Sequence, residues 1–232
     1  QKKFQWWPTA AKPGPVKDER GGYWWWPKEK GNVVGAWGNR GYIYVYKIIY
    51  DYKEGLPEPK ENEVLIKVAA CGICHGEAIV KEGHFPGIKY PRIPGHEVIG
   101  TIDKLGFRVE DWELGQRVGV GWHGGHCFKC SACRKGEFLA CENSLITGIS
   151  TDGGYGEYMV ARSEVLVSIP DELNSVEGAP LLCAGRATFG ALKYIAARGG
   201  DLVAIHGLGG LGHLAVQYAV RLGFKIVVLS RG

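Results

Sequence analysis

Four cysteines that lie close together in the sequence are the clearest candidates for chemistry. Cys127, Cys130, Cys133 and Cys141 are separated by two, two and seven residues. A structural zinc site needs four soft ligands in a closed tetrahedron. A lobe this short has little apolar material, so metal binding would have to supply much of its folding free energy. The spacing therefore predicts a structural zinc site.

An iron–sulfur cluster is the alternative for this lobe. Bacterial ferredoxins separate the last two cysteines of the motif by three residues and continue with proline. Here the last gap is seven residues and Glu142 follows. We therefore interpret the lobe as a zinc site, which is colourless, and a brown chromophore would contradict that interpretation.

Three further cysteines and one histidine could form a second metal site. They are Cys71, Cys74, Cys183 and His96. Two thiolates and one imidazole with an open fourth position make one type of catalytic zinc site. Spacing alone does not join these residues, because a cysteine in apolar surroundings often belongs to a core.

A glycine-rich turn lies between a predicted strand at 201–206 and an apolar-periodic helix that runs to about residue 222. Gly207, Gly209 and Gly212 have the spacing G-x-G-x-x-G. In a dinucleotide site the first glycine makes the turn, the second admits the pyrophosphate and the third permits close helix packing. The helix N-terminus, at Gly210 and Leu211, would offer N–H groups to the phosphates.

The strand after this helix, residues 224–229, ends at Ser230 and Arg231. An NAD site has an acidic residue here for the ribose 2′-hydroxyl, whereas Ser and Arg suit a 2′-phosphate. These residues favour NADP(H) over NAD(H). The alternative is that Arg231 stacks on the adenine and that an acidic residue lies further along the chain.

Taken in order, these motifs resemble those of the zinc-dependent medium-chain alcohol dehydrogenases, most closely the yeast and bacterial branch. The resemblance covers about residues 41–232. It rests on CGICH at 71–75, GHE at 95–97, the four-cysteine lobe, DGGYGEY at 152–158, LCAG at 182–185 and the glycine turn at 207–212.

The resemblance implies two Zn²⁺ ions per chain. Cys74, His96 and Cys183 would bind the catalytic zinc, and Glu97 would be a nearby carboxylate that can hydrogen-bond or transiently ligate. Cys71 would be a bystander. The four-cysteine lobe would hold the structural zinc.

The same resemblance assigns supporting residues. Glu77 would orient the zinc-bound histidine, as carboxylates next to metal sites commonly do. His75 would lie near the cofactor pyrophosphate. Phe85 and Trp122 would line the substrate pocket.

The implied activity is the interconversion of a primary alcohol and an aldehyde, with a nicotinamide cofactor that carries the hydride and zinc as the Lewis acid. A cytoplasmic homodimer or homotetramer that acts on small molecules is expected, with neither nucleic acid nor membrane as a partner.

Three positions depart from the family pattern. Gly76 stands where a hydroxyl residue starts a proton relay, Ile79 replaces a relay histidine, and Ala187 replaces a threonine, with Thr188 next to it. Protons would then leave through water or the cofactor ribose, or activity would be impaired. A catalytically silent zinc-binding protein on the same scaffold is the alternative function.

Composition sets the outer limits of these interpretations. The chain has 232 residues, of which 45% are hydrophobic and 22% charged, and its net charge is +4. These values are ordinary for a globular protein and exclude wholesale disorder. Apolar runs are too short for a membrane helix. Seven cysteines, an odd number, suit a reducing compartment and metal binding better than a disulfide framework.

The elements that must position these residues form an α/β chain. Predicted strands lie at 63–68, 97–102, 117–120 and 158–167. A helix start follows at 174–177, where a capping Asn precedes Glu by three residues, and a second helix spans 185–197. The resemblance implies a GroES-like catalytic domain at 41–183 and the start of a doubly wound Rossmann domain at 184–232. Only two of about six strands are present, so a truncated protein is expected.

Residues 1–40 form a leader that the resemblance does not cover. Six of the eight tryptophans lie in the first 37 residues, and the segment shows neither strand nor helix periodicity. We favour a poorly ordered or non-native leader. The alternative is an aromatic and basic arm that stacks on bases or sugars.

Overall fold

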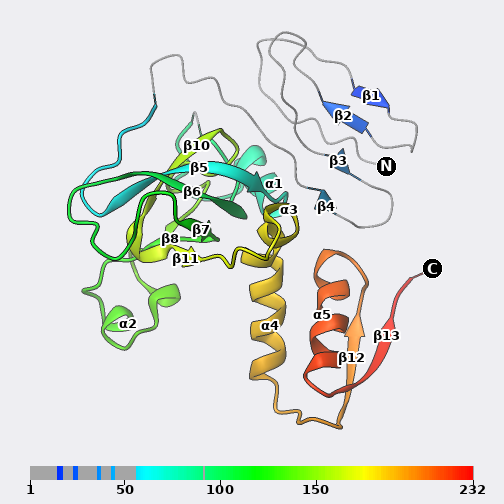
Figure 1. Cartoon of the computed structure of the whole chain (residues 1–232). Helices are drawn as coiled ribbons and strands as arrows, with labels where there is room; N and C mark the ends of the chain where they lie inside the picture. The colour runs from blue at the N-terminus through cyan, green and yellow to red at the C-terminus, as the bar shows by residue number, and fades with distance from the viewer. Residues whose placement is uncertain are drawn as a thin grey trace.

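The computed structural model describes residues 56–90 and 92–231, together with the backbone of four short strands between residues 15 and 44. These strands form an antiparallel sheet in the order β1-β2-β3-β4 (Figure 1). Their bounds are Pro15–Lys17, Tyr23–Trp25, Ala36–Trp37 and Ile43–Tyr44. Short strands therefore occur where the sequence showed no periodicity. The rest of the leader lies outside the described residues.

A five-stranded antiparallel sheet forms the body of the molecule, in the order β10-β5-β6-β7-β11. Its strands are β5 (Glu63–Cys71), β6 (Val98–Leu105), β7 (Arg117–Val120), β10 (Tyr158–Arg162) and β11 (Val167–Ser168). Val64, Ile66, Val98 and Val118 are fully buried in its core. The predicted β-rich unit is confirmed.

Two parts of this unit differ from the prediction. The single strand expected at 158–167 is broken by the 3-10 turn η2 (Ser163–Val165). The Ser163 N–H still donates to the Asn62 carbonyl at 2.8 Å, which extends the pairing with β5 by one residue, and the Leu166 N–H then donates to the Ser163 carbonyl at 3.4 Å, which closes the turn. Helix α1 (Gly76–Glu82) was not predicted. Its N-cap, His75, makes no side-chain capping bond, so the usual start signal is missing.

The four-cysteine lobe projects from this body. It contains α2 (Ser131–Arg134) and the 3-10 turn η1 (Phe138–Ala140). At its base, β8 (His123–Gly125) pairs with β9 (Leu145–Ile146). Figure 1 shows the lobe at the side of the sheet away from the C-terminal elements.

Helices follow the sheet as predicted. Asn174 caps α3 (Ser175–Gly178), since its side-chain oxygen accepts the Val176 N–H at 2.8 Å. The 3-10 turn η3 (Ala179–Leu182) then leads into α4 (Ala184–Tyr194). The predicted second helix is three residues too long, because Ile195 takes an extended backbone conformation.

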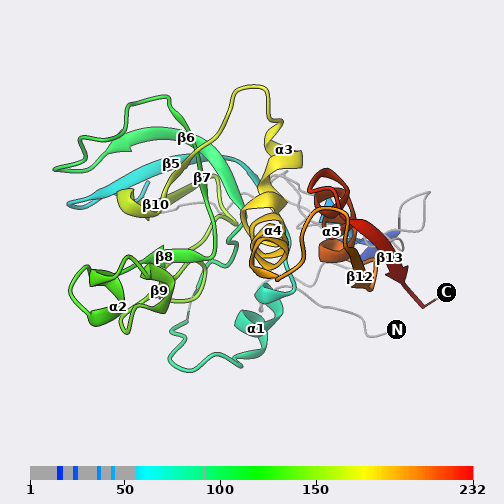
Figure 2. The same cartoon turned by 90° about the horizontal axis from the view of Figure 1, so that it is seen from below.

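The C-terminal elements form a strand–helix–strand unit. Strand β12 (Leu202–His206) runs parallel to β13 (Lys225–Leu229), and α5 (Gly210–Arg221) connects them. Both views place α4 beside α5 (Figures 1 and 2). Leu192, Ile205 and Ala219 form a small core between the helices and strands. Among the described residues, no helix is long and apolar enough to cross a bilayer.

Candidate metal centres and nucleotide turn

The four cysteines of the lobe converge as predicted. Cys127 lies before α2, Cys130 caps it, Cys133 lies within it, and Cys141 follows η1. The sulfur of Cys127 is 3.6 Å from Cys141 and 3.9 Å from Cys133, and Cys130 and Cys141 are 3.9 Å apart. A tetrahedron with Zn–S bonds of about 2.3 Å has edges of about 3.8 Å. All four cysteines are free thiols, and their spacing fits a tetrahedral metal site.

Backbone N–H groups surround the sulfurs of this lobe. Lys129 and Cys130 donate to the sulfur of Cys127 at 3.5 and 3.4 Å, and Asn143 donates to Cys141 at 3.3 Å. The first two bonds lower the pKa of the Cys127 thiol to about 6. These contacts favour the thiolate, the metal-binding form of cysteine, at Cys127, whereas burial raises the pKa of Cys133 to about 12.

The second cluster is assembled by the pairing of β5 with β6. Cys71 lies opposite Val98 in that pair, and the Gly72 N–H donates to the Glu97 carbonyl at 2.8 Å. This places Cys74, just after β5, beside His96, just before β6. Cys183 arrives from the junction of η3 and α4.

The donor atoms of this second cluster also match a metal site. The sulfurs of Cys74 and Cys183 lie 3.8 Å apart, close to the tetrahedral edge. One donor atom from each of Cys74, His96, Glu97 and Cys183 lies within 4.8 Å of all the others. The structure therefore brings together the four residues that were predicted to share a site.

Glu77, on α1, holds two of these residues in place. Its Oε1 is 2.6 Å from His96 Nδ1, and its Oε2 accepts the Cys74 N–H at 2.8 Å. Glu77 is fully buried and His96 is 2% exposed. This contact occupies Nδ1 and leaves the buried Nε2 of His96 without a hydrogen-bond partner within the described residues. A metal ion is a natural partner for such a nitrogen.

The charges in this cluster depend on one another. The hydrogen bond with Cys183, with added contacts from His96, lowers the pKa of Cys74 to about 4. Burial by itself lowers the pKa of His96, but Cys74 and Glu77 outweigh it and raise that pKa to about 10. The same bond to Cys74, together with burial, raises the pKa of Cys183. These shifts favour a thiolate at Cys74, an imidazolium at His96 and a neutral thiol at Cys183.

Glu97 adds a buried carboxylate to the cluster. It is fully buried, and neither carboxyl oxygen has a hydrogen-bond partner within the described residues. Burial, with the nearby Cys74 thiolate, raises the pKa of Glu97 to about 8. A Cβ atom at Gly72 would lie 1.9 Å from Oε2, so glycine is required to admit this side chain.

Of the remaining predicted residues, Trp122 is in contact with the cluster. Trp122 packs edge-on against His96, with ring centroids 4.7 Å apart, as a pocket wall would. His75 is exposed at the N-cap of α1, and Phe85 is half-buried just after that helix. Cys71 is buried and bonds to the Gly72 carbonyl, and it is not part of the donor cluster.

The glycine turn has a backbone suited to a pyrophosphate. Gly207 has φ +92°, which only glycine adopts readily. A Cβ atom at Gly209 would meet nothing within 4 Å, so the backbone there is open to a ligand. A Cβ at Gly212 would lie 1.8 Å from the Gly207 carbonyl oxygen, so glycine is needed for close packing.

Helix α5 begins at Gly210, and the next residue, Leu211, is exposed. Beyond β13, Ser230 and Arg231 are both exposed, and the Ser230 hydroxyl donates to the Arg231 carbonyl at 3.1 Å. Because β12 and β13 run parallel, Arg231 lies at the same edge of the strand pair as the glycine turn, and it is exposed there.

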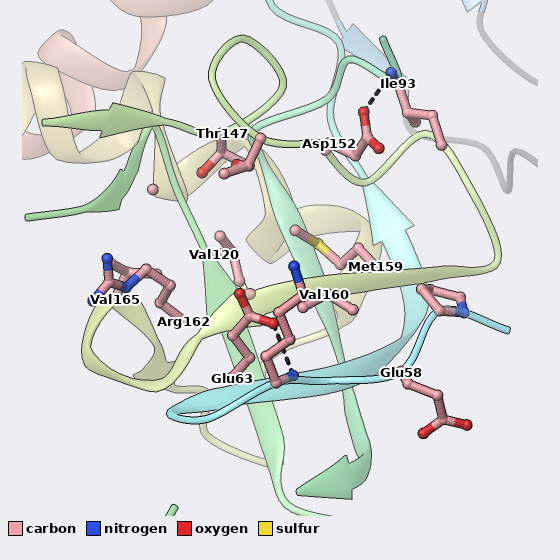
Figure 3. A pocket seen from close by; sticks show the side chains of 16 residues that line it. Glu58, Glu63, Ile93, Val120, Thr147, Asp152, Met159, Val160, Arg162 and Val165 are labelled. Atoms are coloured by element: carbon pink, nitrogen blue, oxygen red, sulfur yellow. Dashed lines mark hydrogen bonds between the residues drawn. The ribbon is translucent and has the colours of Figure 1, made fainter. Parts of the chain in front are cut away.

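A cavity of about 340 Å³ lies elsewhere, against β5 and β10 (Figure 3). Val120, Thr147, Met159 and Arg162 are among its lining residues. None of Cys74, His96, Glu97 and Cys183 lines this cavity, so it is separate from the candidate metal site.

Known proteins similar to this chain are alcohol dehydrogenases. The family model of the alcohol dehydrogenase GroES-like domain matches residues 60–171. The alcohol dehydrogenase patD of Aspergillus clavatus is 48% identical over 177 residues, which are 76% of this chain and 45% of that protein. An alcohol dehydrogenase of Geobacillus stearothermophilus is 41% identical over 191 residues, covering 79% of this chain and 56% of the relative.

Solved structures show the same likeness. A CAD from Helicobacter pylori, complexed with NADP(H), has a TM-score of 0.70 and 29% identity, over 82% of this chain and 58% of its own. A cobalt- and zinc-bound alcohol dehydrogenase from Pyrobaculum aerophilum has a TM-score of 0.69 and 30% identity, over 75% of this chain and 53% of its own.

The chain spans about half the length of the curated relatives that it matches. These relatives do not single out the yeast and bacterial branch. With the GroES-like domain, the two cysteine-containing clusters and the start of the nucleotide fold in one chain, this protein belongs to the zinc-type medium-chain alcohol dehydrogenase family.

Proposed function

We propose that this chain belongs to an enzyme that interconverts a small primary alcohol and its aldehyde with zinc and a nicotinamide cofactor. The observation that carries the proposal is the second cluster. Two sulfurs lie 3.8 Å apart, beside a buried histidine nitrogen that has no partner within the described residues. Relatives named alcohol dehydrogenase support the reaction class.

Cys74, His96 and Cys183 would hold the catalytic zinc, with Glu97 as a neighbouring carboxylate, and the lobe cysteines would hold a structural zinc. A zinc ion in the open site would supply Lewis-acid polarisation of the substrate oxygen. Glu77 keeps His96 turned toward the site through Nδ1. Trp122 and Phe85 would shape an apolar pocket that excludes water.

The nicotinamide cofactor, when bound, would carry the hydride. The N–H groups at the start of α5 would bind its pyrophosphate, with His75 close by. We place the boundary between the catalytic and cofactor domains at Cys183, with the catalytic domain at 41–183 and the cofactor domain at 184–232.

We propose that NADP(H) is the preferred cofactor, because Ser230 and Arg231 suit a 2′-phosphate. Replacing Arg231→Ala should weaken NADP(H) binding by about 10-fold or more, the effect of losing one charge-assisted bond, and leave NAD(H) binding unchanged. Arg221→Ala, at the exposed end of α5, is the control. Equal losses for both cofactors would contradict this preference.

We also propose that the protein is a homodimer or homotetramer in the cytoplasm. All seven cysteines are free thiols, which suits a reducing compartment.

The test combines zinc analysis with alcohol-dependent reduction of the cofactor. Two zinc ions per chain and turnover that stops with chelator would support the enzyme. Zinc binding without turnover across a broad panel of primary alcohols would contradict it.

A catalytically silent zinc protein is the second candidate, and Gly76 favours it. Gly76 has no hydroxyl for a proton relay. A Cβ there would lie 2.9 Å from His96 Cε1 and 3.2 Å from Trp122 Cζ3. The silent protein would bind zinc and bind the cofactor only weakly. Gly76→Thr is therefore a poor rescue, because the added side chain must displace His96.

A further inference from the structure

A loop segment packs against the chain that leads into His96. Three successive N–H groups of residues 153–155 donate to the three carbonyl oxygens of residues 93–95, at 2.7, 2.9 and 3.0 Å. These carbonyls immediately precede His96. We call residues 152–155 the clamp segment.

Asp152 extends the clamp by one side chain. Its Oδ1 accepts the Ile93 N–H at 3.1 Å and a hydrogen bond from Arg92 Nη1 at 2.8 Å. Figure 3 shows the Asp152 carboxylate turned toward Ile93. The clamp segment thus holds four consecutive residues on the approach to His96.

Glycines let the two segments approach this closely. A Cβ at Gly153 would lie 2.2 Å from the Gly95 carbonyl oxygen, and one at Gly154 would lie 2.2 Å from Val98 Cγ2. Gly95 has φ +104°, and its own Cβ would lie 2.6 Å from Tyr155 Cδ1. Any side chain at these positions would push the segments apart.

Tyr155 connects the clamp to the second ligand-bearing segment. Its hydroxyl donates to the Gly72 carbonyl at 3.2 Å, two residues before Cys74. Its ring lies against Gly95, one residue before His96. The side chain is 8% exposed. One buried tyrosine therefore spans the two loops that carry Cys74 and His96.

We propose that the clamp segment is a positioning element that sets the distance between Cys74 and His96 and so tunes the metal affinity of their site alone. The proposal rests on the proposed function, in which these residues hold zinc. Outer contacts of this kind commonly change metal affinity by about 10- to 100-fold. The four-cysteine lobe has its own backbone donors and should not respond.

The experiment measures zinc affinity in the full chain by competition with a chromophoric chelator, resolving the two equivalents. Gly153→Ala should weaken one equivalent by about 10-fold or more, and Tyr155→Phe by about 3- to 10-fold, the effect of one lost hydrogen bond. The other equivalent should stay within about twofold.

Matched controls separate positioning from general destabilisation. Gly190→Ala adds a Cβ that meets nothing within 4 Å, and Tyr194→Phe alters a side chain that is 90% exposed. Both should leave the two affinities unchanged. Asp152→Asn keeps an oxygen acceptor for Ile93 and should retain more affinity than Asp152→Ala. The melting temperature of the metal-free chain is measured alongside.

Three outcomes decide the proposal. Selective weakening of one equivalent in the clamp variants supports it. If the unmodified chain binds two equivalents but clamp variants match their controls, or lose both equivalents together, the clamp proposal is wrong. If the unmodified chain binds only one equivalent, the ligand assignment is wrong and the clamp proposal falls with it.

Discussion

The two cysteine-containing clusters have similar sulfur–sulfur distances, but they differ in their donor types and in how far apart the donors lie along the chain. In the lobe the sulfurs lie 3.6 to 3.9 Å apart, and in the second cluster they lie 3.8 Å apart. The lobe draws its donors from 15 consecutive residues, whereas Cys74 and Cys183 are 109 residues apart. The lobe is all sulfur and closed. The second cluster has fewer sulfurs, a histidine and buried carboxylates.

This difference shows what each cluster depends on. The lobe has little core of its own, so we expect its fold to depend on a bound metal ion. The second cluster is positioned by the paired strands β5 and β6 and by Glu77, so we expect its arrangement to persist without metal. Loss of metal should therefore unfold the first and merely empty the second.

The largest expected effect comes from removing one sulfur at each cluster. Cys133→Ser should abolish lobe metal binding, whose apparent free energy in structural sites is about 10–16 kcal/mol, and lower the melting temperature sharply. Cys183→Ser should lose the other equivalent with a much smaller change in melting temperature. Metal analysis and thermal unfolding test both. Equal destabilisation by the two variants would remove the distinction between the clusters.

The next largest expected effect is proton release when metal binds to the second cluster. At neutral pH we expect Cys74 to be a thiolate, because its pKa is lowered to about 4, and His96, whose pKa is raised to about 10, to carry a proton that metal must displace. Cys183, whose pKa is raised, must also lose its proton. Two protons leave from these two ligands, so affinity should rise about 100-fold per pH unit between about pH 6 and 8, and more steeply if Glu97, with a pKa of about 8, also binds the metal.

Calorimetry in buffers of different ionisation enthalpy counts these protons as the second equivalent binds. An affinity that is flat, or that falls as pH rises, would show that His96 and Cys183 do not release protons when metal binds.

A smaller effect is expected at Glu77, which has no counterpart in the lobe. Glu77→Gln removes the charge that faces His96 Nδ1 and should weaken one metal equivalent by about 10- to 100-fold. Glu82→Gln, an exposed change on the same helix, is the control. Chelator competition resolves the equivalents, and unchanged affinity in Glu77→Gln would mean that the histidine is positioned by packing alone.

The smallest effect is expected at Gly76. Gly76→Ala places a Cβ 2.9 Å from His96 Cε1, so the imidazole must shift by a few tenths of an ångström. We expect a loss of about 2- to 5-fold in affinity at that site, with the lobe unaffected. Gly190→Ala serves again as the control. A gain in metal affinity would contradict this expectation, because it would mean that the shifted imidazole of His96 is better placed to bind the metal.

Local chemistry explains what could be predicted from the sequence. The lobe follows from spacing alone, because its ligands are neighbours along the chain. Strand β7 has the predicted bounds, and Asn174 caps α3 as predicted. Gly207 and Gly212 have the turn and packing roles expected of them.

What could not be predicted depends on tertiary pairing. Helix α1 has no capping side chain at His75, and it starts with a glycine, which disfavours helix. No local pattern shows that Glu77 would meet His96 or that Tyr155 would reach Gly72. The sequence contained DGGYGEY as a motif, but its contacts with residues 93–95 required the fold. The ligand and cofactor roles remain predictions.

The zinc-to-protein ratio of the full chain, with and without Cys183→Ser, distinguishes two separate zinc sites from one. We expect two zinc ions in the unmodified chain and one in a folded Cys183→Ser variant. A ratio of one in both proteins, or iron in place of zinc, would contradict the existence of two distinct zinc sites.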